Sequence, residues 1–250
     1  MTGTGNSNLT RDAFLGGRLH LWQPREGYRA GVDAVLLAAS VGATTGQRVL
    51  ELGCGVGTAI LCLNSRVPGL RLAAVEVQPT MADLARRNGG DALEVFTADV
   101  AELPADLRQR QFDHVLANPP YYDRAASVRS GDPAREAAHG ETTPLATWVR
   151  VAAKRLAPRG QAHFIHRAER LPDLIRALPD DLGSVEVLPL AAREGRAPDR
   201  VILRARKNGR GAFRLHPALA LHVGAHHSDA NKDYAPVVDA ALREGAALRF

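Results

Sequence analysis

The sequence predicts an α/β protein with a mostly parallel sheet of seven strands, helices on both faces, and an antiparallel pair of strands at one edge. From residue 48 onward, short apolar segments alternate with helical ones, and a glycine-rich turn follows the first apolar segment. This alternation favours parallel strands joined by right-handed crossovers. Only the loop 191–200 separates the last two apolar segments, so we expect these two strands to be antiparallel.

The individual elements follow from the hydrophobic pattern. The expected strands cover 49–52, 72–77, 93–97, 112–117, 162–166, 185–190 and 201–205. Helices are expected at 32–40, 56–66, 80–88, 142–156 and 169–178. In the segment 142–156, apolar residues recur at helical spacing and form one apolar face; they are Leu145, Trp148, Val149, Ala152 and Leu156.

The chain is expected to form a single domain with small additions at its ends. Residues 1–10 are rich in Gly, Asn, Ser and Thr, which is typical of a disordered tail. Residues 11–47 are expected to form a hairpin around Gly16-Gly17 and then a helix with Asp33 in its first turn. The Rossmann-like domain is expected to cover 48–250, including a C-terminal addition.

Composition excludes several classes of protein. Of the 250 residues, 45% are hydrophobic and 24% charged, which is ordinary for a globular chain and excludes wholesale disorder. No apolar run approaches the roughly 20 residues that span a bilayer, and the N-terminal segment does not resemble a secretory signal. The two cysteines, Cys54 and Cys62, cannot form a disulfide framework. We therefore expect a cytoplasmic protein with both thiols buried, and no membrane partner.

Basic residues are concentrated in the second half of the chain. Residues 1–125 carry 12 basic and 13 acidic residues, whereas residues 126–250 carry 20 basic and 14 acidic residues. Between Arg193 and Arg214 there are eight basic residues and only two acidic ones. Such a field attracts polyanions, although an arginine-rich solvated surface explains the same pattern. RNA contacts are predicted for Arg204, Arg206, Lys207 and Arg210.

A glycine-rich loop follows the first strand. Residues 51–57 read Glu-Leu-Gly-Cys-Gly-Val-Gly, so Glu51 precedes three alternating glycines, Gly53, Gly55 and Gly57. Glycines permit a sharp turn and let a ligand lie against the main chain, beside the polarised N-terminus of the next helix. A dinucleotide fingerprint would place its third glycine at position 58, which is Thr58.

Polar residues also follow the next three strands. Glu76 ends the second strand, where a carboxylate can accept hydrogen bonds from both hydroxyls of a ribose. Asp99 follows the third strand, within reach of an adenine amino group, and Asn118-Pro119-Pro120-Tyr121 follows the fourth. A Rossmann-like domain that binds NAD, with an incidental Asn-Pro-Pro-Tyr, is the alternative.

The tetrapeptide resembles the Asn-Pro-Pro-Tyr motif of S-adenosylmethionine-dependent methyltransferases that act on planar exocyclic amines, and this resemblance implies the following roles. The nitrogen lone pair is delocalised into the ring, so activation needs acceptors for both N–H bonds; the Asn118 side chain and the Pro119 carbonyl supply two. Pro119 and Pro120 have fixed φ angles and hold the carbonyl in place. Tyr121 can stack on a base that has been flipped out of its helix or loop.

These motifs resemble the class I S-adenosylmethionine-dependent methyltransferases, and the tetrapeptide resembles those that methylate amino groups. Segments 23–38, 118–122, 196–207 and 233–244 are similar to the bacterial family that methylates N6 of the adenosine at position 37 of tRNA(Val). The resemblance implies a Rossmann-like fold, S-adenosyl-L-methionine as cofactor, and tRNA as substrate. It also implies that Asp33 helps shape the methionine end of the cofactor site; the alternative for Asp33 is a simple helix-start acid.

The long segment 123–141 follows the tetrapeptide. A loop of this length is usually functional or disordered. We interpret it as a flap over the flipped base, with Arg124, Arg129 and Arg135 meeting RNA phosphates; a disordered insert is the alternative.

Other functions share parts of this pattern. Protein glutamine-N5 methyltransferases that act on release factors share the tetrapeptide, and ribosomal RNA guanine-N2 methyltransferases resemble it. A non-enzymatic RNA-binding module is a further alternative. His222, His226 and His227 have the spacing of metal ligands on a helix, but no neighbouring Cys or acidic pair completes a site, so no metal is expected. The oligomeric state is left open.

Overall fold

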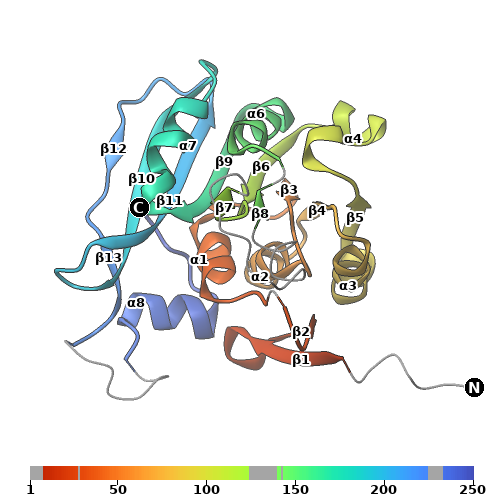
Figure 1. The fold of residues 1–250 in the computed structure, drawn as a ribbon, viewed down its shortest axis with the longest axis horizontal. Coiled ribbons are helices and arrows are strands. Elements are labelled where there is room, and N and C mark those ends of the chain that lie inside the picture. Colours follow the sequence, from red (N-terminus) through yellow and green to blue (C-terminus); the bar gives the residue numbers. More distant parts are fainter. Residues whose placement is uncertain (1–7, 28, 124–139, 142, 225–232) are drawn as a thin grey trace, which may run out of the picture.

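The computed structural model describes residues 8–27, 29–123, 140–141, 143–224 and 233–250. Its centre is a nine-stranded sheet with the order β12-β10-β11-β9-β6-β3-β4-β5, in which β13 also pairs with β10. Figure 1 shows helices packed on both faces of this sheet. The predicted fold class is therefore confirmed.

One half of the sheet is parallel. Its strands, all parallel to their neighbours, are β3 (Arg48–Leu52), β4 (Arg71–Glu76), β5 (Leu93–Thr97), β6 (Phe112–Ala117) and β9 (Leu156–Arg167). All five coincide with predicted strands, and β9 begins six residues earlier than expected. Parallel strands leave their carboxyl ends at one edge of the sheet, where ligands bind in such folds.

The other half is antiparallel at its centre. β11 (Pro198–Lys207) is antiparallel both to β9 and to β10 (Leu182–Arg193), as expected for strands joined by a short loop. The antiparallel pair is not the edge of the sheet, however, because β12 (Arg214–Leu215) and β13 (Leu219–His222) pair with β10 beyond it. Two strands this short carry too weak an alternating pattern to be recognised in the sequence.

The helices of the fold are α1 (Val32–Ser40), α2 (Thr58–Arg66), α3 (Pro79–Gly89), α4 (Ala105–Gln109), α6 (Leu145–Arg155), α7 (Leu171–Ala177) and α8 (Pro236–Asp239). Five of them, α1, α2, α3, α6 and α7, lie close to their predicted positions, whereas the short helices α4 and α8 were not predicted. Short 3₁₀ turns occupy Leu15–Gly17, Gly90–Ala92, Val100–Glu102 and Ala168–Arg170, and a π turn, Ala240–Glu244, continues α8. Two further strands, β7 (Tyr122–Asp123) and β8 (Gly140–Glu141), form a separate parallel pair.

Two apolar cores cover the two faces of the sheet. In β4, Leu72 and Ala74 pack into the core that contains α1 and α2, whereas Ala73 and Val75 pack into the core that contains α4, α6 and α7. Figure 1 shows α1, α2 and α3 on one face and α4, α6 and α7 on the other. Successive side chains of a strand point to opposite faces, so a sheet covered on both sides needs continuous apolar strands.

The N-terminal hairpin consists of β1 (Leu9–Phe14) and β2 (Leu19–Pro24), which pair antiparallel. The hairpin starts inside the segment expected to be a disordered tail, so that prediction is wrong for Leu9 and Thr10; residues 1–7 lie outside the described residues. The strand partner supplied by β2 orders these residues despite their polar composition. None of the helices in the described part of the chain is both long and apolar enough to span a membrane.

Candidate active site

A pocket opens at the carboxyl ends of the parallel strands. It gathers the ends of β3, β4 and β6 and the loops that follow them. Nine of the residues predicted for cofactor binding or catalysis line it: Glu51, Gly53, Gly55, Glu76, Asp99, Asn118, Pro119, Pro120 and Tyr121. Segments up to 70 residues apart in the sequence are brought together because each lies at or just after the carboxyl end of a strand of the same parallel set.

The glycine-rich loop is shaped by both backbone and packing constraints. Gly53 has φ +66°, and a Cβ atom there would lie 2.5 Å from the Trp148 ring, so no side chain fits. Gly55 also has a positive φ, of +55°, and a Cβ there would meet no atom within 4 Å. The main chain at Gly55 is therefore open to a ligand on the pocket side.

Two carboxylates lie beside this loop. Glu76 is buried, and its two oxygens accept hydrogen bonds from the Gly55 N–H at 2.8 Å and the Gln78 N–H at 2.9 Å. Asp99 accepts from the Ala101 N–H at 2.7 Å and from the Thr143 hydroxyl at 3.0 Å. These bonds fix the orientation of both carboxylates. Both bonds to Asp99 end on its Oδ1 atom, so its Oδ2 atom and the remaining lone pair of each Glu76 oxygen are the acceptors that a ligand hydroxyl or amine could use.

Glu51 lies at the base of the pocket and is 3% exposed. One of its oxygens accepts the Ile60 N–H at 2.9 Å. Burial raises the pKa of the Glu51 carboxyl to about 8, against the opposing effect of the Ile60 hydrogen bond, and the nearby negative charge of Glu76 adds to the rise. A cation bound in the pocket would lower this pKa again.

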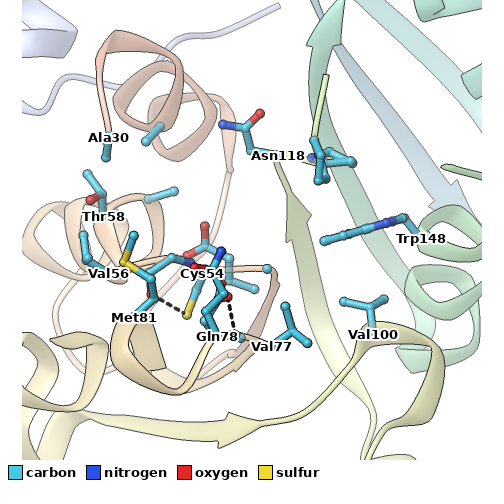
Figure 2. Close-up of a pocket in the computed structure, with 18 of the residues that line it drawn as sticks. Ala30, Cys54, Val56, Thr58, Val77, Gln78, Met81, Val100, Asn118 and Trp148 are labelled. Atoms are coloured by element: carbon cyan, nitrogen blue, oxygen red, sulfur yellow. Dashed lines mark hydrogen bonds between the residues drawn. The ribbon is translucent and has the colours of Figure 1, made fainter. Parts of the chain in front are cut away.

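The Asn118–Tyr121 segment forms another wall of the pocket. Figure 2 shows Asn118 and Trp148 across the pocket from Val56, Thr58 and Met81. The Asn118 Oδ1 atom is buried and has no hydrogen-bond donor among the described residues. A buried acceptor without a donor is costly, and an amine N–H entering the pocket would remove that cost.

The charge of the pocket is one-sided. Among the described residues that line it, three are carboxylates (Glu51, Glu76 and Asp99) and none is a lysine or arginine. Opposite charges attract strongly where water is excluded. The pocket therefore favours a cationic ligand.

Several lining residues lie outside the motifs predicted for the site. Trp148 is on the apolar face predicted for its helix, and its Nε1–H donates to the Thr143 carbonyl at 3.1 Å. Gln23, from β2, accepts the Ala30 N–H at 2.9 Å and is 2% exposed. The Thr58 hydroxyl is buried without a partner among the described residues. No local signal separates these residues from ordinary core positions, because only the fold brings them to the pocket.

Two predicted cofactor residues do not line the pocket. Gly57 has φ +87° and precedes α2, and a Cβ there would contact Leu61 and Leu93 at 3.4 Å. The glycine at position 57 therefore permits the turn from the loop into α2. Asp33 directs its carboxylate to the Tyr121 hydroxyl, at 2.6 Å, instead of to the pocket.

The basic residues of β11 are distributed along the length of the strand. In the register of the two strands, Arg200 lies opposite Arg167 at the active-site end of β9, whereas Arg206 lies opposite Gln161, six residues earlier in β9. That is about 20 Å along the strand. Arg206 and Arg210 are exposed, and they lie toward the opposite end of the sheet.

Two of these basic residues are engaged within the fold, and the RNA contacts predicted for them stay a prediction. Arg204 pairs with Glu186 at 3.0 Å, donates to the Phe250 carbonyl at 2.6 Å and stacks on the Phe250 ring. Lys207 pairs with Asp181 and donates to the Ala153 carbonyl at 3.0 Å. Long basic side chains pack their stems and satisfy carbonyls in this way without marking a ligand surface.

The remaining predictions fall partly outside the described residues. Arg124, Arg129 and Arg135 are in that category, as are His226 and His227. His222 is described, and its Nδ1 lies 2.9 Å from an Asp233 oxygen. Across the described ranges, no three His, Cys, Asp or Glu side chains are grouped as a metal site would require. Cys54 and Cys62 are both buried free thiols, as predicted.

Comparison with known proteins adds independent findings. A family model described as a methyltransferase domain matches residues 49–128. The tRNA1(Val) (adenine(37)-N6)-methyltransferase of Porphyromonas gingivalis is 30% identical over 199 residues, covering 72% of this chain and 77% of that protein. The protein of the same name from Aeromonas hydrophila is 31% identical over 211 residues, covering 82% and 85%.

Solved structures agree on the fold. A predicted O-methyltransferase from Agrobacterium tumefaciens superposes with a TM-score of 0.69 at 24% identity, covering 86% of this chain and 98% of that chain. The Thermus thermophilus 16S rRNA N2 G1207 methyltransferase, solved in complex with AdoMet and guanosine, has a TM-score of 0.55 at 19% identity, covering 90% and 51%. At these identities the two structures establish the architecture alone.

Proposed function

The chain belongs to the tRNA1(Val) (adenine(37)-N6)-methyltransferase family, and from this premise we propose that it transfers a methyl group from S-adenosyl-L-methionine to N6 of adenosine 37 in tRNA(Val). The observation that carries the proposal is the buried Asn118 Oδ1, an acceptor without a donor among the described residues, in the wall of an acidic pocket. An exocyclic amine is a ligand that satisfies this atom, and a sulfonium ion is a ligand that matches the charge.

The pocket residues fit the proposed cofactor. Glu76 would accept the ribose hydroxyls, since it ends the second strand of the parallel set. Asp99 would accept the adenine amino group, and the open main chain at Gly55 would lie against the methionine part. Glu51 would supply a negative charge beneath the bound cation. The NAD alternative is disfavoured because Thr58 occupies the position of the third glycine of a dinucleotide fingerprint.

The catalytic roles belong to the tetrapeptide. Bound S-adenosyl-L-methionine supplies a methyl group on a positively charged sulfur, which makes the carbon electrophilic. Asn118 Oδ1 and the Pro119 carbonyl would each accept one N–H of the target amine, so that its lone pair points away from the ring. The ring of Pro119 fixes its φ angle, one of the torsion angles between the two acceptors, and so restricts their relative position. Rate enhancement then comes from positioning and from dipoles that are already oriented.

The bond changes balance without a further reactant. The new N–C bond forms as the C–S bond breaks, and S-adenosylhomocysteine leaves as a neutral thioether. The methylated nitrogen then loses one proton, which can pass to water after transfer. No strong general base is required, which agrees with the acidic residues of the pocket being placed to hold the cofactor.

The direct test is methyl transfer from labelled S-adenosyl-L-methionine. Unmodified tRNA(Val) transcript is compared with a transcript in which adenosine 37 is replaced by guanosine, and with ribosomal RNA and a release factor. After digestion, we expect label only in N6-methyladenosine from the first transcript. Label in protein glutamine, or in guanine N2 of ribosomal RNA, would support the corresponding alternative enzyme. No transfer to any substrate, with RNA binding intact, would support a non-enzymatic module.

A further inference from the structure

Tyr121 is held by residues from two other parts of the fold. Its hydroxyl donates to the Asp33 Oδ2 atom at 2.6 Å, and the Arg200 Nε–H donates to the same oxygen at 3.1 Å. The Arg200 guanidinium also lies over the Tyr121 ring, with its carbon 4.8 Å from the ring centre. One carboxylate oxygen thus joins the tetrapeptide to α1 and to the start of β11.

This arrangement is partly shielded from water. The Asp33 and Arg200 side chains are 28% and 29% exposed, respectively. The Tyr121 and His166 rings meet in an edge-to-face arrangement, with a centroid distance of 5.4 Å and an interplanar angle of 69°. Hydrogen bonds that involve a charged group are about twice as strong as neutral ones, and partial burial strengthens them further. The Tyr121 ring is therefore fixed in position and not merely in contact.

The tetrapeptide transmits that constraint to the proposed acceptors. Only Pro119 and Pro120 lie between Tyr121 and Asn118, and their rings fix two of the intervening torsion angles. A displacement of Tyr121 therefore moves the Pro119 carbonyl and the Asn118 amide with it. Acceptors misplaced by about 1 Å can lower a rate on the order of a hundredfold.

Neither Asp33 nor Arg200 lines the pocket that would hold the cofactor. We propose that Asp33 and Arg200 are positioning residues, which act through Tyr121 to hold the Asn118 and Pro119 acceptors in the geometry that methyl transfer requires. The inference rests on the proposed function, and it replaces the contact with the methionine part that the family resemblance implied for Asp33. The antiparallel half of the sheet thereby contributes to catalysis through Arg200.

The test separates the rate of transfer from cofactor binding. Single-turnover methyl transfer to tRNA(Val) transcript and calorimetric binding of S-adenosylhomocysteine are measured for Tyr121→Phe, Asp33→Asn, Arg200→Gln and the double variant Tyr121→Phe/Asp33→Asn. We expect each single variant to be about 10- to 100-fold slower, with the dissociation constant for S-adenosylhomocysteine within about twofold of wild type. The double variant should be no slower than the slower of the two single variants, because both remove the same hydrogen bond.

Two measurements make the outcome decisive. The melting temperatures of cofactor-free wild type, Tyr121→Phe, Asp33→Asn and Tyr121→Phe/Asp33→Asn form a second double-mutant cycle, independent of activity, in which non-additivity is expected. Asp106→Asn and Arg176→Gln serve as controls, since each removes an exposed partner of a surface ion pair; both should transfer methyl groups at the wild-type rate. Tyr121→Phe keeps the aromatic ring, so the test survives even if Asp33→Asn fails to fold.

The possible failures are distinguishable. If the wild-type chain methylates no tRNA, the proposed function fails and the positioning role fails with it. If the wild type is active but the three single variants keep its rate, only the positioning role is overturned. Rate losses that multiply in the double variant, or affinity for S-adenosylhomocysteine that falls in step with the rate, would equally overturn it.

Discussion

The two halves of the sheet use their charged residues differently. In the parallel half, Glu51, Glu76 and Asp99 meet in one pocket that has no described lysine or arginine in its lining. In the antiparallel half, Arg200, Arg204 and Lys207 lie along one strand, and each has a partner in the fold. Motifs at the ends of consecutive parallel strands meet at one edge of the sheet, whereas charges within a single strand are spread along its length.

The two halves of the sheet would therefore have different roles in the proposed reaction. The parallel half would hold the cofactor and the target amine. In the antiparallel half, Arg200 would help to hold the catalytic loop in position. Arg206 and Arg210 would contact parts of the RNA that lie farther from the pocket. Substitutions in the two halves should therefore change different kinetic parameters.

The largest effect is expected at Asn118. Asn118→Ala removes one of the two proposed acceptors of the target amine, and a preoriented group of this kind is typically worth about 10²- to 10³-fold in rate. We expect a loss of that size in single-turnover methyl transfer, with binding of S-adenosylhomocysteine within about twofold of wild type by calorimetry. An equal loss of cofactor affinity would contradict the separation of donor and acceptor roles.

The next effect concerns the acidity of the pocket. The Glu51 carboxyl has an ordinary pKa of 4.5 when it is exposed to water, and burial in the fold raises this pKa to about 8. As the pH rises above 4.5, the unfolded chain releases this proton first, so the stability that the protonated side chain contributes is lost between pH 4.5 and about 8. The side chain of Glu51→Gln cannot ionise. When the pH rises from about 5.5 to 8, the free energy of unfolding should therefore fall by about 3 kcal/mol more in the wild type than in this variant.

Urea unfolding of the cofactor-free protein at these two pH values measures this difference. Glu102→Gln is the matched control, because Glu102 is an exposed carboxylate outside the pocket, and its pH dependence should equal that of the wild type. If Glu51→Gln and wild type lose stability in parallel, Glu51 is ionised in the empty pocket and the burial argument is wrong.

Glu76→Gln should weaken the cofactor without changing the chemical step. The charged partner of the ribose hydroxyls becomes a neutral amide, and hydrogen bonds to charged groups contribute about 1.5–3 kcal/mol, which corresponds to about 10- to 100-fold in affinity. We expect the KM for S-adenosyl-L-methionine to rise by this factor, while the rate at saturating cofactor stays within about threefold of wild type. A rate that does not recover at saturation would place Glu76 in the chemical step.

The smallest effect is expected at the far end of β11. Arg206→Gln/Arg210→Gln removes two exposed charges, so the dissociation constant for tRNA should rise about threefold and its salt dependence should flatten. The pair Arg71→Gln/Arg108→Gln changes net charge equally, on exposed residues of the parallel half. If both pairs have the same effect on tRNA binding, net charge alone attracts the RNA, and the position of β11 is irrelevant.

Much of the architecture was predictable because the relevant signals are local. The strands β3 to β6 and the helix Val32–Ser40 were predicted within one residue, since strand and helix periodicities extend over only a few residues. Nine predicted site residues share one pocket because each lies at or just after the carboxyl end of a strand of one parallel set. The short strands β12 and β13 were missed because two to four residues carry no readable alternation.

The sequence by itself determined the class of the protein, the order of its motifs and the tetrapeptide that identifies an amine as the target. Only the tertiary structure decided which charges act together. Asp33 and Arg200 are 167 residues apart and meet at Tyr121, whereas Arg200 and Arg206 are six residues apart and lie toward opposite ends of the sheet. Hydrogen bonding and electrostatic attraction depend on distance in space, and pairing between distant strands sets that distance independently of separation along the chain.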